Sequence, residues 1–412
     1  MTRLPLEHIR IIDLTQAWAG SYALQLLGDF GAEVIKVESR TRPDPWRGGF
    51  EAGRGLAAYP VSGPGERPYN RSYLANSVNR NKYGITLDLS TGEGRELFLD
   101  LVRDADVVAE NFTPRVLTNL GIGFEELRAV QPGIILLSMP AFGLSGPYSE
   151  YPGIGGTIEP MSGNASLLGE PGGGAQVSGV MYPDAVAGLN GAAAVLAALH
   201  ARDATGEGKH VEVSQHESMI AMLGEFFAFE PPPARLGNLD LDVAVQGIFP
   251  AVGEDQWVSI TIRDDRDWGA LRGLISCLAP LLPQSSQCPE ALAACAAIAE
   301  WTAERSAHEL VECLQGLDLP AAKVRSIAEV LACPQLGETG HWVHVEQPEG
   351  IGAIPMPGII ANLHDTPGGV RLPPVRHGEH SAEILEKRLG LTAERIADLT
   401  ARGITGEGPP PA

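Results

Sequence analysis

Short apolar runs alternate with amphipathic stretches through the first third of the chain. Ile9 to Leu14 is suited to a buried strand, a helical stretch follows from about Ser21 to Phe30, and Gly31 is placed to end it. A second apolar run, Ala32 to Val37, comes directly afterwards. Because a strand, a helix and a strand in this order form a crossover, the pattern predicts two parallel strands.

The same order returns further along the chain. A strand is predicted at Ile85 to Leu89, a helix at Gly92 to Arg103 and a strand at Val107 to Glu110. Another apolar run, Ile134 to Ser138, precedes the loop Pro140 to Tyr148. The pattern predicts an α/β fold whose large domain is doubly wound and Rossmann-like. In such a domain, ligands bind outside the carboxyl ends of the strands.

The pattern changes near Glu230, where the segment PPPARLGN predicts a linker. At 412 residues the chain exceeds the size at which one hydrophobic core stops growing, so two domains are expected. Beyond the linker, strands are predicted at Gly247 to Pro250 and Trp257 to Ile262, and Ala-rich helices between Glu290 and Leu317. The predicted organisation is a large α/β domain over residues 1–229, a linker over 230–238, a smaller α+β domain over 239–325, a C-terminal return to the large domain over 326–400, and a disordered Pro/Gly-rich tail over 401–412.

Charge separates one segment from the rest of the chain. The net charge of −21 argues against a nucleic-acid or anionic-membrane partner, since either requires a basic face. From Lys36 to Lys82, however, nine basic residues stand against four acidic ones, a local balance of +5. A solvated loop gives such a pattern as well, but an anionic ligand with several phosphates explains it better.

The five cysteines do not form a metal or disulfide framework. None belongs to a CxxC pair or a Cys/His set with metal-ligand spacing, so no metal site is expected. An odd number of cysteines, with no secretory signal in the first residues, favours a reducing cytoplasm. The uncharged run Ala185 to Leu199 is short and interrupted by Gly and Asn, which predicts a buried helix and not a membrane span.

One segment, GVMYPDAVAGLNGAAAVLAALHARDATGEGKHVEVS (Gly179 to Ser214), places a single acid, Asp184, at the head of a long Ala- and Gly-rich helix. An Asp at a helix start is ordinarily a cap, because its carboxylate accepts bonds from free N–H groups of the first turn. Small residues after Asp184 are expected to let this helix pack closely against its neighbours; they are Ala185, Ala187, Gly188 and Gly191.

This segment resembles the active-site segment of the class III CoA-transferases, the formyl-CoA and carnitine CoA-transferase (CaiB/BaiF) family. Other parts of the chain resemble the same family, in the same order: IRIIDLTQAWAGSYALQLLGDFGAEVIKVE, NRNKYGITLDLSTGEGRELFLDLVRDADVVAENFTP, AFGLSGPY, IEPMSG and PPVRHGEHSAEIL. The resemblance implies that Asp184 is a nucleophile. It would exchange CoA between an acyl-CoA donor and a carboxylate acceptor through an aspartyl–acyl anhydride and an aspartyl–CoA thioester.

The resemblance also implies a CoA site at the strand ends of the large domain, CoA as a substrate without a permanently bound cofactor, and an interlocked, ring-like homodimer. Backbone N–H groups and cations gather at such strand ends, where they hold phosphates. For Asp88 a role as a turn residue stays open, and for Phe112 a role as a core aromatic. The implied CoA contacts are Trp18, Ala19, Ser39, Arg40, Leu87, Asp88, Leu89, Asn111, Phe112, Thr113 and Arg115.

Three positions depart from the formyl-CoA transferase branch and leave the acyl group open. Asn119 stands in place of an arginine, for which the nearby Arg115 is a candidate substitute, and Gly153 stands in place of a lysine. The glycine-rich loop that this branch places over its Asp is missing from the second domain. The run Gly172 to Gly174 lies elsewhere and is expected to be a flexible turn.

Two other functions stay open on the sequence. The related acyl-CoA racemases carry a histidine where this chain has Ile154, so their proton-abstracting base is missing and racemisation is disfavoured. A non-catalytic CoA-binding protein, with Asp184 as a cap only, is the other alternative. The GIGG run from Gly153 to Gly156 is not expected to follow a strand and open a helix, so it does not predict a dinucleotide site.

Overall fold

The computed structural model describes residues 4–228, 235–238, 240, 243, 245–281 and 288–410. The chain forms two compact units, which are described here one at a time. The large unit comprises Met1–Asn164, Val177–Gly224 and Gly337–Ala412, and the small unit comprises Ala165–Gln176 and Glu225–Leu336.

A six-stranded, fully parallel sheet forms the centre of the large unit, in the order β3-β2-β1-β4-β5-β6. This confirms the predicted doubly wound α/β fold, whose direction of winding reverses between β1 and β4. Strand β3 starts three residues earlier than expected, at Lys82. The strands are β1 (Arg10–Asp13), β2 (Glu33–Glu38), β3 (Lys82–Thr86), β4 (Val107–Glu110), β5 (Ile135–Ser138) and β6 (His210–Glu212).

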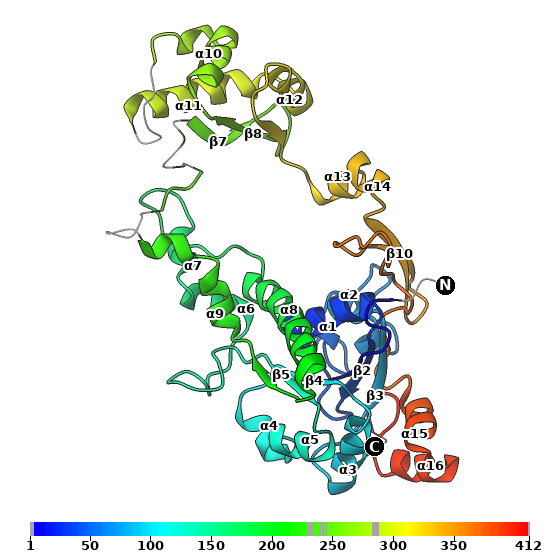
Figure 1. The fold of residues 1–412 in the computed structure, drawn as a ribbon. Coiled ribbons are helices and arrows are strands. Elements are labelled where there is room, and N and C mark those ends of the chain that lie inside the picture. The colour runs from blue at the N-terminus through cyan, green and yellow to red at the C-terminus, as the bar shows by residue number, and fades with distance from the viewer. Residues whose placement is uncertain are drawn as a thin grey trace. The chain divides into compact units, whose positions relative to one another are not determined.

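Helices cover both faces of this sheet (Figure 1). Neighbouring strand residues point to opposite faces, so Ile11 belongs to one apolar core and Ile12 to the other. The Ile11 core packs against α1 (Ala19–Asp29) and α8 (Tyr182–Thr205). The Ile12 core packs against α3 (Gly92–Val102), α5 (Phe124–Val130), α15 (Ser381–Leu389) and α16 (Ala393–Ala401).

Short elements complete the large unit. Strands β10 (Trp342–Gln347) and β11 (Gly352–Pro357) form an antiparallel hairpin in its C-terminal part. The short helices are α2 (Tyr73–Ser77), α4 (Arg115–Leu120), α6 (Gly155–Met161) and α9 (Gln215–Ala221), with 3₁₀ turns at Pro45–Arg47 and Pro68–Asn70. Along the chain, α7 (Asn164–Leu167) and α14 (Pro334–Glu338) cross the boundaries between the two units.

The small unit has its own three-stranded antiparallel sheet, in the order β7-β8-β9, and its own apolar core. Both predicted strands are present here, the first two residues longer than expected. The elements are β7 (Val245–Pro250), β8 (Trp257–Ile262), β9 (Ala321–Lys323), α10 (Asp265–Leu274), α11 (Pro289–Ala303), α12 (Ala307–Gln315) and α13 (Ile327–Leu331).

The division into units differs from the predicted one at two places. Residues 165–176 belong to the small unit, where Gly169 O accepts a hydrogen bond from Gly237 N at 3.1 Å and Gly173 O accepts one from Arg235 at 2.9 Å. The chain returns to the large unit at Gly337 and not at residue 326. Of the predicted linker, residues 230–234 lie outside the described part of the chain.

The predicted disordered tail, residues 401–412, is wrong for residues 401–410, and residues 411 and 412 lie outside the described part of the chain. The Arg40 guanidinium donates hydrogen bonds to the carbonyls of Thr400, Thr405, Gly408 and Pro409 at 2.6–3.2 Å. Ile404, just after α16, is buried in the apolar core. A composition rich in Gly and Pro predicted disorder, but a buried cation satisfies the carbonyls of this segment and holds it in place.

Candidate active site

Asp184 is the third residue of α8, and its side chain is buried, with 6% exposed. The small residues that follow it do allow close packing, as the sequence predicts. A Cβ added at Gly188 would lie 2.9 Å from the backbone oxygen of Ala19 and 3.0 Å from the Tyr22 ring. The close approach of α8 to α1 brings the first turn of α1 next to Asp184.

Three helix starts converge on this carboxylate. Asp184 lies in the first turn of α8, and its carboxylate interacts with the backbone N–H groups of Ala19 at the start of α1 and Gly155 at the start of α6. Gly155 is so close that an added Cβ would lie 2.1 Å from Asp184 Oδ2. Helix N-termini carry partial positive charge, so the site favours an anion. The expectation that GIGG opens no helix is therefore wrong, because α6 begins at Gly155.

Burial and these N–H groups act on Asp184 in opposite directions. Burial raises the pKa of Asp184 to about 6, while the N–H groups of Ala19, Asp184 itself and Gly155 reduce the increase. Among the described residues, none makes a hydrogen bond of normal geometry to Oδ2. Asp184 is therefore a poorly solvated carboxylate that is still ionised at neutral pH, which suits a nucleophile.

The loop between β1 and α1 lies at the point where the strand order reverses. Asn111, directly after β4, joins the two sides of this point: its side chain accepts a hydrogen bond from Gln16 N and donates one to Gln16 O, both at 2.8 Å. The Asn111 amide, predicted to contact CoA, thus has both polar atoms bonded within the protein. In doubly wound sheets this reversal is the usual ligand site.

The other predicted CoA contacts follow the carboxyl ends of β2, β1 and β4, or lie just past β3. Trp18 caps α1, with its ring 5.7 Å from that of Trp46, and Ala19 faces Asp184. The carbonyl of Ser39 contacts the ring of His377 at 3.2 Å. The guanidinium of Arg40 is bonded to the C-terminal segment, as described above.

The predicted contacts that follow β3 and β4 have mixed environments. Leu87 is a core residue with 1% exposed, and Leu89 and Phe112 pack against the same core. Asp88 is a turn residue: its carboxylate accepts hydrogen bonds from Ser90 N and Oγ at 3.0 and 2.6 Å. Thr113 is half-buried, and Arg115 is exposed and paired with Glu150 at 3.0 Å.

The basic segment is less available to a ligand than its composition suggests. Six of its nine cations are buried: Lys36, Arg40, Arg47, Arg71, Arg80 and Lys82. Four of these six form ion pairs inside the protein, Lys36 with Asp44, Arg47 with Glu38, Arg80 with Asp29 and Lys82 with Asp13. The local charge of +5 therefore reflects internal pairing with acids, some of them outside the segment.

Similarity to known proteins shows the family of this chain. The profile of CoA-transferase family III matches residues 6–381. The succinyl-CoA–D-citramalate CoA-transferase of Chloroflexus aurantiacus is 32% identical, over 97% of this chain and 98% of its own. The succinate–glutarate CoA-transferase of Agrobacterium fabrum is 31% identical, over 92% of this chain and 95% of its own. A crystal structure of a CaiB/BaiF family protein from Brucella suis superimposes with a TM-score of 0.83 at 29% identity, covering 94% of this chain and 100% of that one.

The chain belongs to CoA-transferase family III. It is an enzyme whose substrates are CoA thioesters and carboxylic acids. Among the residues that the structure describes, no three His, Cys, Asp or Glu side chains are grouped to hold a metal ion.

Sequence reasoning missed two parts of this CoA-transferase site. The first is Gly155, for which the sequence predicted neither a helix start nor a close approach to Asp184. Ile154, where the racemases carry histidine, occupies the N-cap position of α6 and is 58% exposed. The second missed part is Asp44, whose carboxylate accepts a hydrogen bond from Ala17 N at 3.0 Å in the loop after β1. No sequence signal connects Asp44 to that loop, because 27 residues separate Asp44 from Ala17.

Proposed function

We propose that Asp184 carries the CoA transfer covalently. The ionised carboxylate attacks the thioester carbonyl of the acyl-CoA donor, the C–S bond breaks, and CoA leaves as thiolate with an aspartyl–acyl anhydride behind it. The thiolate attacks the aspartyl carbonyl and releases the donor acid, which gives an aspartyl–CoA thioester. The acceptor carboxylate then runs the two steps in reverse. Each leaving group departs as an anion, so no proton has to be moved.

The convergence of three helix starts on one buried carboxylate is the observation that carries this proposal. When the thiolate attacks the aspartyl carbonyl, negative charge develops on an Asp184 oxygen, and the N–H groups of Ala19 and Gly155, which interact with this carboxylate, are donors of the kind that stabilises an oxyanion. Burial also limits water around the Asp184 anhydride, which water would hydrolyse. A simple helix cap needs neither a second and third helix start nor burial.

We propose a dicarboxylic acid as the acyl group, with succinyl-CoA as the first donor to test. Several relatives of similar length are named for succinyl-CoA or succinate, including the D-citramalate and glutarate enzymes above and a succinyl-CoA:mesaconate CoA-transferase of Haloarcula hispanica that is 31% identical. A donor screen should therefore begin with succinyl-CoA and include monocarboxylic acyl-CoAs as the comparison.

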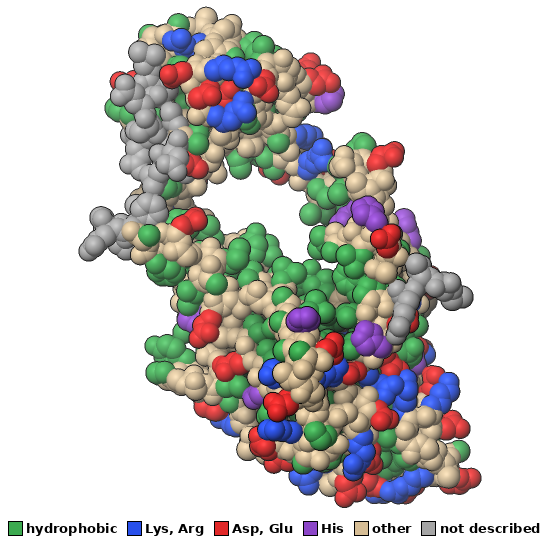
Figure 2. All heavy atoms as spheres, in the orientation of Figure 1, with side chains coloured by type: hydrophobic (Ala, Val, Ile, Leu, Met, Phe, Trp, Pro, Cys, Tyr) green, Lys and Arg blue, Asp and Glu red, His purple; other side chains and the backbone are tan. Residues whose placement is uncertain are grey.

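We also propose a homodimer, interlocked as the family resemblance implies, in a reducing cytoplasm. Helix α8 is long and apolar, but only one of its faces is buried. On another face, Leu189 and Leu196 are 51% and 44% exposed. These residues are seven apart and share one face, and apolar side chains gather on the surface over α8 (Figure 2). Exposed apolar patches of this kind mark protein interfaces. None of the five cysteines, all in the described part of the chain, is joined in a disulfide, which suits a reducing compartment.

The decisive experiment traps the intermediate. The protein is incubated with succinyl-CoA and hydroxylamine, which converts an activated aspartyl group to a hydroxamate, and the peptide containing Asp184 is examined by mass spectrometry. We expect the modification on Asp184 and none in Asp184→Asn, which keeps capping ability but is not a nucleophile. Transfer activity in Asp184→Asn would overturn the covalent mechanism.

A further inference from the structure

Buried side chains from other elements fix the backbone of the loop between β1 and α1. At its second residue, Thr15 N donates to Asp13 Oδ1 at 2.8 Å, and Thr15 O accepts from Lys36 Nζ at 2.7 Å. Asp13 and Lys36 are both 0% exposed. Hydrogen bonds to charged partners are strong in a buried site, so these two bonds hold the backbone of Thr15 in place.

The next two loop residues are fixed in the same way. Asn111 bonds both backbone groups of Gln16, and Ala17 N donates to Asp44 Oδ1 at 3.0 Å. Ala17 has a φ of +55°, a left-handed conformation that is unfavourable for a residue with a Cβ. Backbone in this region persists where its surroundings hold it, and Asp44 supplies the bond that does so.

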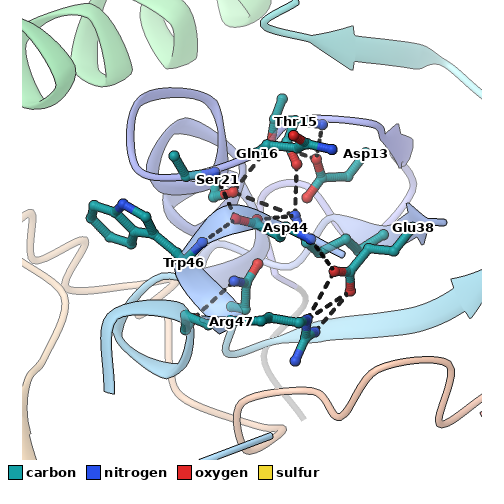
Figure 3. Close-up of polar contacts among 12 residues, drawn as sticks. Asp13, Thr15, Gln16, Ser21, Glu38, Asp44, Trp46 and Arg47 are labelled. Carbon is teal, nitrogen blue, oxygen red and sulfur yellow. Dashed lines mark hydrogen bonds and ion pairs between the residues drawn. The ribbon is translucent and has the colours of Figure 1, made fainter. Parts of the chain in front are cut away.

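Asp44 is itself part of a buried network of charges (Figure 3). Its side chain is 1% exposed, Oδ1 also accepts from Trp46 N at 3.0 Å, and Oδ2 lies 3.3 Å from Lys36 Nζ. Asp44 thus connects the loop residue Ala17 to the same lysine that holds Thr15. Buried ion pairs contribute little net stability, so stability alone does not explain why these charges are buried together.

The position of the loop bears directly on Asp184, because α1 begins two residues after Ala17 and the Ala19 N–H group interacts with that carboxylate. We propose that Asp44 is a positioning residue for the transfer reaction: with Lys36, it holds the loop so that Ala19 N–H faces Asp184. Asn111 does the same from the β4 side. This inference rests on the proposed nucleophilic role of Asp184.

The test compares Asp44→Asn with Asp29→Asn. Asp29 is a matched control: it is 1% exposed, paired with Arg80 at 2.7 Å, and lies at the other end of α1, far along the helix from Ala19. We expect Asp44→Asn to lower kcat by roughly 10- to 100-fold, as small misplacements of reacting groups do. We expect kcat of Asp29→Asn to stay near that of the wild type. Circular dichroism and melting temperature show whether the two variants are comparably folded.

The pH profile supplies a readout that a merely structural role would not move. Loss of the Ala19 N–H interaction raises the midpoint of the kcat/KM profile in Asp44→Asn, whereas loss of a nearby negative charge by itself would lower it. An unchanged or lowered midpoint, or a kcat equal to that of Asp29→Asn, would overturn the proposal. Hydroxylamine trapping of Asp184 in the wild type still decides the covalent mechanism separately.

Asn111→Ala provides the answer if Asp44→Asn does not fold, because Asn111 is uncharged and only partly buried. If Asn111 is a positioning residue, Asn111→Ala should lower kcat and shift the midpoint of the pH profile. KM for succinyl-CoA should stay within about threefold of the wild-type value, because Asn111 then makes no contact that binds the substrate. If Asn111→Ala raises KM and leaves kcat and the midpoint unchanged, Asn111 is a CoA ligand and the loop does not depend on it.

Discussion

At the scale of single residues, Asp184 combines two properties that ordinarily exclude each other: it is buried, yet ionised near neutral pH. Burial disfavours the carboxylate, and three helix starts favour it, so its pKa settles at about 6. A carboxylate that has lost most of its hydration reacts more readily than one in water. Because the pKa of Asp184 is raised, both the stability and the activity of the protein should depend on pH near 6.

The first prediction concerns the pH dependence of the rate. In the proposed mechanism only ionised Asp184 attacks the thioester, so kcat/KM for succinyl-CoA, the proposed donor, should rise with pH through about 6 and level off above it. The measurement is the initial rate at constant ionic strength, taken about every 0.5 pH unit from about pH 4.5 to about pH 8.5. A flat profile across about pH 6 would contradict the assignment of the nucleophile.

The second prediction concerns the stability of Asp184→Asn. The folded-state pKa of about 6 lies above the ordinary 3.8, so protonation stabilises the fold below about pH 3.8, and this contribution is lost as pH rises through about 6. At pH 8 the neutral Asn variant should therefore be more stable than the wild type, by about 3 kcal/mol. Melting curves at pH 8 and pH 4 test this, because the difference should shrink towards the lower pH. A role as a helix cap alone predicts little change in stability at pH 8, because Asn caps a helix about as well as Asp does.

The third prediction uses two adjacent glycines. A Cβ at Gly155 would meet Asp184 Oδ2 at 2.1 Å, whereas a Cβ at Gly156 meets nothing within 4 Å. Gly155→Ala should therefore lower kcat at least about 100-fold, because the carboxylate has to move away from its donors. Gly156→Ala should remain near wild-type activity. Equal activity of the two variants would show that the start of α6 takes no part in transfer.

At the scale of elements, the contact between α1 and α8 sets the geometry of the site. The start of α1 supplies Ala19, the start of α8 supplies Asp184, and glycines on α8 keep the two helices close. Sequence patterning identifies both helices, α1 by its apolar period and α8 by its long uncharged Ala- and Gly-rich run. Patterning does not show that their N-terminal ends meet.

The fourth prediction tests this contact with two glycines of α8. A Cβ at Gly188 would press on the backbone oxygen of Ala19 at 2.9 Å, whereas one at Gly191 would meet the flexible end of Met139 at 2.8 Å. Alanine raises helix propensity equally at both positions, by about 1 kcal/mol. Gly188→Ala should reduce kcat about tenfold or more by moving the start of α1, and Gly191→Ala should have a smaller effect. Steady-state kinetics on both variants checks the order, and the reverse order would contradict the argument.

At the scale of the whole molecule, the exposed apolar face of α8 leads to the fifth prediction. The protein should have twice the mass of one chain by light scattering coupled to size exclusion. A double variant, Leu189→Lys with Leu196→Lys, should lose this assembly, because two charges enter an apolar interface. Leu292, which is 55% exposed on α11 of the small unit, provides the matched control as Leu292→Lys. A wild-type mass of a single chain at micromolar concentration would rule out the dimer.

The sequence by itself determined the α/β fold class and the resemblance to CoA-transferase family III. Apolar runs and crossover helices placed β4 at Val107–Glu110 and the other central strands within three residues, because the period of a buried strand or helix is a local property. The family resemblance singled out Asp184. Local pattern alone left that residue as a cap.

Only the tertiary structure decided which groups surround Asp184. The Ala19 and Gly155 N–H groups, the clamp of Asn111 on Gln16, and the link from Asp44 to Ala17 all join residues that are far apart in sequence. The same holds for Arg40 and the C-terminal segment, where a predicted disordered tail is held by a buried cation. Such contacts depend on which strand ends lie side by side, and strand order comes from long-range packing that no local period encodes.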